Sequence, residues 1–136
     1  MQGKQTRFFA ALIVLAVAAI SGCGGGNTIT PAVQPQIVNM QDSFSFQITG
    51  ASNVTQTLTY TWANSKTRSN TNHSSAITGG TATVTVKDNA GTVVYTNALL
   101  STGTFASSVG TAGNNWTIIV TLTNLSGTIN FSEQAL

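Results

Sequence analysis

The sequence is poor in the side chains that carry out chemistry. Of its 136 residues only 6% are charged, with five Lys or Arg, three Asp or Glu, one His and one Cys. An ordinary globular domain is about 25% charged. A single Cys excludes an intramolecular disulfide, and one His with three separated acids provides too few ligands for a zinc site. The composition therefore predicts a protein that is not an enzyme and holds no cofactor.

Positively charged residues are scarce outside the N-terminal segment of residues 1–22. Two of the basic residues, Lys4 and Arg7, precede an apolar run and account for the formal net charge of +2. The charges from residue 23 onward cancel: Lys66, Arg68, Lys87, Asp42, Asp88 and Glu133. Nucleic-acid binding requires basic residues clustered on the folded domain. The charge distribution therefore argues against a nucleic-acid partner.

Long apolar runs are absent after residue 22, and the one that is present spans residues 8–20. It is shorter than the roughly 20 apolar residues of a membrane-spanning helix. A basic segment, a short apolar segment and small residues in this order are typical of a secretory signal. We expect residues 1–22 to be a signal helix that is removed, the alternative being a permanent N-terminal anchor helix.

The residues that end this segment are Ile20, Ser21, Gly22 and Cys23. They resemble the lipobox of bacterial lipoproteins, which more often has Leu where this chain has Ile20. The resemblance implies cleavage before Cys23, lipidation of its thiol and attachment to a bacterial envelope membrane through the lipid. Because Gly24 and not Asp follows, it favours the outer membrane where two membranes exist. The alternative for Cys23 is a free or intermolecularly paired thiol.

Residues 24–36 contain both prolines of the chain and three consecutive glycines, and they show no hydrophobic periodicity. Such a composition is typical of a linker. We therefore expect Cys23 and residues 24–36 to form a flexible tether, and residues 37–136 to form one domain.

From residue 37 onward apolar and polar residues alternate, which is the period of strands with one buried face. The apolar positions of the clearest runs are Phe44, Phe46 and Ile48, then Leu58, Tyr60 and Trp62, then Ala82, Val84 and Val86, then Trp116, Ile118, Val120 and Leu122, and finally Ile129 and Phe131. Turn residues follow at 88–91 and 124–127. The spacing predicts an all-β fold, a single antiparallel β-sandwich of seven to nine strands.

The pattern from Gly113 to Phe131 resembles the last hairpin of jelly-roll-like sandwiches, such as bacterial pre-peptidase C-terminal domains and the accessory domain of subtilisin-like convertases. In these families a strand of alternating aliphatic residues that contains a Trp is followed by a strand that begins with Gly. The resemblance implies a jelly-roll-like architecture and no particular activity. Trp62 and Trp116 share their strand faces with aliphatic residues, so we expect both in the core.

The predicted contact region is a polar stretch, residues 64–80, since binding sites on sandwiches lie in connecting segments. The candidate ligand contacts are Lys66, Arg68, His73, Tyr95 and Phe105. The alternative for this stretch is a solvated loop or a polar edge strand. Asp88 and Asn89 are the only calcium candidates, and weak ones, because a tight turn rarely supplies six to eight oxygens.

The sequence therefore predicts a lipid-anchored, non-enzymatic envelope β-sandwich that binds a ligand or a surface such as a glycan. The alternative is a structural or assembly protein that pairs with itself or with another envelope protein. The many Thr residues of the strands are either a recognition surface or β-branched residues that favour strands while staying wettable.

Overall fold

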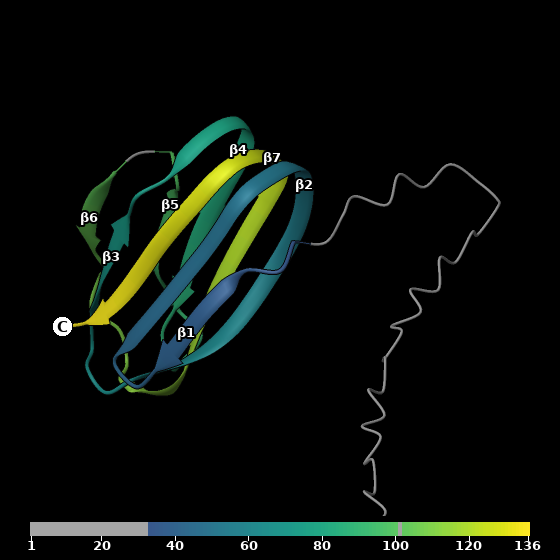
Figure 1. Cartoon of the computed structure of the whole chain (residues 1–136). Coiled ribbons are helices and arrows are strands. Elements are labelled where there is room, and N and C mark those ends of the chain that lie inside the picture. The colour runs from purple at the N-terminus through teal and green to yellow at the C-terminus, as the bar shows by residue number, and fades with distance from the viewer. Residues whose placement is uncertain (1–32, 101) are drawn as a thin grey trace, which may run out of the picture.

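The computed structural model describes residues 33–100 and 102–136, and all seven strands among them belong to one antiparallel sheet (Figure 1). The strands are β1 (Gln36–Met40), β2 (Ser43–Asn64), β3 (Ser69–His73), β4 (Ala76–Lys87), β5 (Val93–Ala98), β6 (Gly103–Ala106) and β7 (Gly113–Ala135). The prediction of an all-β fold is confirmed. The expected signal helix, Cys23 and most of the linker lie outside the described residues. Within the described part there is no helix of the length and apolarity needed to cross a membrane.

The two longest strands, β2 and β7, form the frame of the sheet. They pair from Ser43 opposite Gln134 to Asn64 opposite Gly113, and both curve over at one end of the molecule (Figure 1). One half of the sheet contains β1, β3 and β6 with the first part of β2 and the last part of β7. The other half contains β4 and β5 with the remaining parts of β2 and β7.

The bend explains a difference from the sequence prediction. The runs around residues 44–48 and 58–62 belong to one strand, β2, and the predicted turn at 124–127 lies inside β7. Register shifts between Ile48 and Gln56 interrupt the pairing there. Such irregularities bend a strand without ending it. Runs that the sequence predicts as separate strands are therefore the two arms of one bent strand, in β2 and again in β7.

Side chains replace the missing ladder bonds at the bend. Asn124 has a positive φ of 49°, and its N–H donates to Thr55 Oγ1 at 2.9 Å. The N–H of Asn53 donates to Ser126 Oγ at 3.0 Å. Gly80 crosses the bend with a φ of +71°, and a Cβ there would overlap the Asn124 carbonyl oxygen. Only glycine fits a position that is this close to another main chain.

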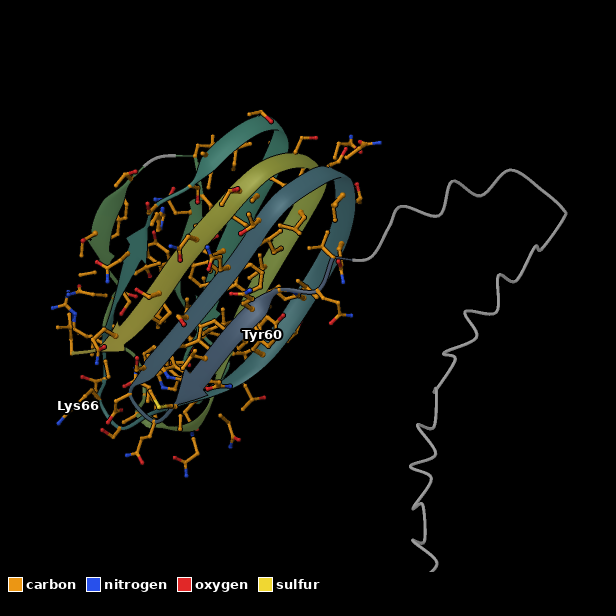
Figure 2. All side chains as sticks on the ribbon, in the orientation of Figure 1. Tyr60 and Lys66 are labelled. Carbon is orange, nitrogen blue, oxygen red and sulfur yellow. The ribbon has the colours of Figure 1, made fainter. Side chains whose placement is uncertain are left out.

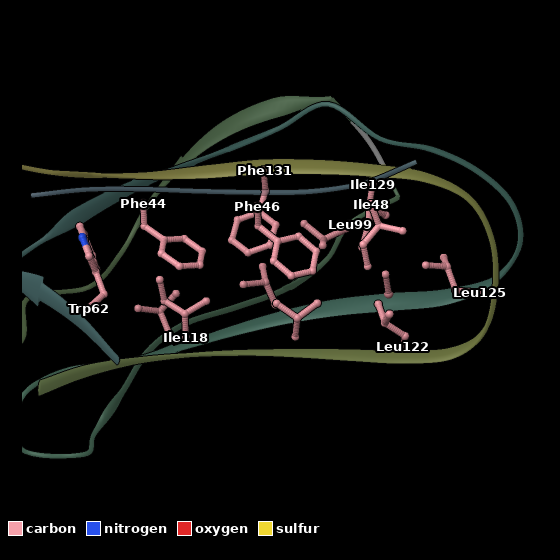
Figure 3. Packing of buried hydrophobic residues seen from close by; sticks show 14 of the residues in the cluster. Phe44, Phe46, Ile48, Trp62, Leu99, Ile118, Leu122, Leu125, Ile129 and Phe131 are labelled. Atoms are coloured by element: carbon pink, nitrogen blue, oxygen red, sulfur yellow. The ribbon is translucent and has the colours of Figure 1, made fainter. Parts of the chain in front are cut away.

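The apolar core lies between the two halves of the sheet (Figure 3). Trp62 and Trp116 are fully buried, as the alternation predicts, and their rings meet edge to face with centroids 5.8 Å apart. Their indole N–H groups donate to the carbonyl oxygens of Met40 and Thr111. Burial of one such ring stabilises the fold by about 2–3 kcal/mol. The tryptophans therefore belong to the core.

Candidate functional site

Three of the five predicted contact residues come together at one side of the core. His73 ends β3, Tyr95 lies in β5 and Phe105 in β6, so both halves of the sheet contribute. A hydrogen bond of 2.8 Å joins His73 Nε2 to the Tyr95 hydroxyl. The ring centroids of His73 and Phe105 are 4.9 Å apart. Tyr95 and Phe105 are partly exposed, while His73 is 2% exposed, so the side chains form a largely covered cluster.

Strand pairing adds a carboxyl group to this cluster. On β3 the inward residues are polar, and Thr71 lies opposite Glu133 of β7 and opposite Phe105 of β6. The Thr71 hydroxyl donates to Glu133 Oε1 at 2.6 Å. Ser69, the first residue of the same strand, is also fully buried. We call His73, Tyr95, Phe105, Thr71, Ser69 and Glu133 the polar cluster.

Glu133 is the unusual member of the polar cluster. Removal from water raises its carboxyl pKa from 4.5 to about 7, and the hydroxyl dipoles of Thr71 and Ser69 offset this in part. Within the described residues, Glu133 Oε2 and Ser69 Oγ are buried without a hydrogen-bond partner. Burial also raises the pKa of Tyr95, and the negative charge of Glu133 raises it further. The cluster can therefore hold or release a proton near neutral pH.

The sequence reasoning missed Glu133, which it treated as one of three scattered acids. A signal was present: Ile129, Phe131 and Glu133 follow one another at period two, and all three are buried. The same alternation places Ser69, Thr71 and His73 on the inward face of β3. A strand whose inward residues are polar does not stand out in a hydrophobic pattern.

Lys66 and Arg68 do not join the polar cluster. They precede β3, and His73 ends it, so Arg68 and His73 lie roughly 16 Å apart along the chain. Arg68 Nε donates to the carbonyl oxygen of Ser107 at 3.1 Å. Lys66 is exposed and extends away from the sheet in Figure 2. The predicted contact region thus divides into the segment with Lys66 and Arg68 and the strand β3 with His73. This strand lies between β7 and β6 within the sheet.

The two calcium candidates are engaged in a turn. Asp88 Oδ1 accepts the N–H groups of Ala90 and Thr92, and its Oδ2 accepts that of Thr111. Burial alone would raise the pKa of Asp88, but these main-chain hydrogen bonds outweigh it and lower the pKa. Asn89 Oδ1 accepts the N–H of Asn115 at 3.0 Å. These oxygens therefore stabilise the connection between β4 and β5.

Hydroxyl, carboxamide and aliphatic side chains cover the outward faces of the sheet. On the half with β4 and β5, Thr59, Ile119, Thr85 and Thr96 form one cross-strand row. On the half with β1, the corresponding row consists of Gln36, Gln47 and Asn130. Lys87 is the one charged residue of the seven described strands that lies on an outward face.

The polar cluster combines a carboxyl, an imidazole, a phenol and two hydroxyls, which suits hydrogen bonding and proton holding. Within residues 33–100 and 102–136, no three His, Cys, Asp or Glu side chains lie close enough together to hold a metal ion. In comparisons with known proteins, no protein-family model and no curated protein matches this chain.

Proposed function

We propose that the chain is a lipid-anchored, non-enzymatic protein of a bacterial envelope whose folded part binds an uncharged ligand. The lipobox-like residues ending in Cys23 support the anchor. One observation carries the binding proposal: the outward faces of the strands present hydroxyl and carboxamide groups and almost no charge. A ligand on these faces is recognised by hydrogen bonds and shape rather than by ion pairing.

The architecture that goes with this proposal is a jelly-roll-like β-sandwich. Two halves of one bent sheet enclose a common core, as in the two layers of a sandwich (Figure 3). Sandwiches of this kind expose two broad faces and the loops at their ends, which are the usual places for binding.

Charge supports an uncharged ligand. The carboxyl groups of Glu133 and Asp88 are buried, and Asp42 accepts the N–H and O–H of Ser65 in a turn. A charged ligand desolvated on an outward face would therefore find few opposite charges. Each neutral hydrogen bond contributes about 0.5–1.5 kcal/mol, so several are needed for useful affinity.

The test uses the full chain expressed in a bacterial host that processes lipoproteins. We expect mass spectrometry to show a mature N-terminus at Cys23 carrying acyl chains, and to show that the Cys23→Ser variant keeps residues 1–22 and carries no acyl chain. The purified protein in detergent is then applied to arrays of neutral and charged glycans, and we expect binding among the neutral ones. An unmodified N-terminus contradicts the anchor, and an absence of binding contradicts the binding function.

Sheet edges that have no partner strand among the described residues favour a second candidate, an assembly protein. Val38 and Met40 of the edge strand β1 are 50% and 59% exposed, and Val93 of β5 is 49% exposed. Uncharged edges with exposed apolar residues can pair with another chain. Light scattering of the detergent-solubilised protein over a range of concentrations tests this function. A monomer at all concentrations contradicts self-assembly.

A further inference from the structure

A small depression lies on the outward face of the sheet where β1, β2 and β7 meet. Its volume is about 160 Å³, and the residues that line it are Gln36, Ile37, Val38, Ser45, Phe46, Gln47 and Asn130. Nothing in the sequence reasoning pointed to this place. It is separate from the polar cluster, whose members lie on the inward face of the same half of the sheet or in β5.

Strand register places three carboxamides side by side. Gln36 of β1 lies opposite Gln47 of β2, which lies opposite Asn130 of β7. In the next outward row Val38 lies opposite Ser45. Neighbouring strands are about 4.8 Å apart, so the row of carboxamides spans roughly 10 Å. The short side chain of Ser45 leaves room beside this row.

The polar groups of the depression are available to a ligand. Within the described residues, the side chains of Gln36, Gln47 and Asn130 make no hydrogen bond, and neither does the Ser45 hydroxyl. Each carboxamide offers two N–H donors and one carbonyl acceptor. The site therefore presents donors and acceptors together along the row of roughly 10 Å.

Size and charge restrict the ligand class. The volume of about 160 Å³ is below the roughly 300–1,000 Å³ of pockets for drug-sized molecules. None of the described residues in the lining is charged, so an ion would lose hydration without gaining a counter-charge from them. Val38 is half exposed and provides an apolar wall. Neighbouring sugar hydroxyls, each a donor and an acceptor, match this lining, and the C–H groups of the ring match Val38.

We propose that this depression binds one uncharged sugar residue of a glycan, held by the carboxamides of Gln36, Gln47 and Asn130. The inference rests on the proposed binding function and assigns it a place and a ligand class. Because the three side chains come from three strands of one sheet, their spacing is set by the main chain. The site is thus preformed, and binding requires only the ordering of exposed side chains.

The experiment compares variants of the mature lipidated protein in detergent on an array of neutral sugars, uronic acids and short uncharged peptides. We expect binding to a neutral sugar, and at least about tenfold weaker binding for Gln47→Ala and for Asn130→Ala, since each loses a carboxamide hydrogen bond or two. The matched control is Asn114→Ala, another exposed carboxamide of β7 outside the depression. Thermal unfolding should be unchanged in all three variants, because each replaces an exposed side chain.

The outcomes separate this inference from the proposed function. Neutral-sugar binding that survives both depression variants, or that is lost instead in Phe105→Ala, overturns the site and leaves the binding function standing. Binding of the uncharged peptides alone overturns the ligand class and leaves the proposed function standing, whereas binding of uronic acids alone contradicts both. A wild-type protein that binds no probe on the array contradicts the proposed function, and this inference with it.

Discussion

At the scale of single residues, Glu133 shows how a carboxyl group is accommodated in a buried polar cluster beside the apolar core. It is fully buried, and the Thr71 hydroxyl donates to one of its oxygens. A buried carboxylate that accepts a hydrogen bond from a neutral hydroxyl is costly, whereas its protonated form is not. The raised pKa of about 7 expresses this preference for the protonated form.

The first prediction concerns the pH dependence of stability. Glu133 holds its proton more tightly in the folded state, with a pKa of about 7, than in the unfolded state, with a value near 4.5. Stability from this group is therefore fully present below about pH 4.5 and is lost as the pH rises to about 7, by about 3 kcal/mol in total.

Urea unfolding at about pH 5 and about pH 8 measures the effect. The wild-type protein should lose stability at the higher pH, while Glu133→Gln, which cannot ionise, should lose little. An equal pH dependence in both proteins would show that another group is responsible.

At the scale of strands, the bend in β2 and β7 determines the architecture. In β7 the buried positions are even-numbered from Trp116 to Leu122 and odd-numbered from Leu125 to Glu133. Because of this change, even-numbered residues point inward in the first arm of β7 and odd-numbered residues point inward in the second. Both arms therefore face the same core. The alternation predicts each arm separately. It does not distinguish a turn, which ends pairing, from a bend, which keeps it, because the partner strand makes that difference.

The second prediction tests the close approach of main chains at the bend. Gly80→Ala would place a Cβ in overlap with the Asn124 carbonyl oxygen, so the bend must shift. We expect a loss of stability above about 3 kcal/mol, larger than a conformational penalty alone.

The control is Gly50→Ala. Gly50 has a similar φ of +66°, but a Cβ added there would meet nothing within 4 Å. We expect this variant to lose about 1–2 kcal/mol, the cost of a left-handed residue. Denaturant unfolding of both variants gives the comparison, and equal losses would contradict the role of the close approach.

At the scale of the whole molecule, the described charged residues other than Lys87 lie apart from the broad outward faces of the sheet. Lys66, Arg68 and Asp42 lie at the turns that surround the start of β3, while Glu133 and Asp88 are buried. The proposed ligand surfaces therefore have little electrostatic field of their own. Association through them depends on hydrogen bonds and apolar contact.

The third prediction follows from this distribution. Binding of a neutral sugar by the full-length protein should change less than about twofold between low and high salt, since screening acts on charge pairs. The measurement is the array signal at about 0.05 M and about 0.5 M sodium chloride. A steep loss with salt would indicate that charge pairs contribute to binding, which contradicts recognition of an uncharged ligand.

Some features of this protein were determined by the sequence alone. The strands, the inward tryptophans and the turn at Asp88 depend on neighbours within a few residues, so alternation and turn residues predict them. The tertiary structure decided that separate runs join into β2 and β7, and that Thr71 meets Glu133 across 62 residues of sequence. It also decided that Gln36, Gln47 and Asn130 form one row. Such contacts depend on the register between strands that are distant in the sequence, and a local pattern of residues carries no information about that register.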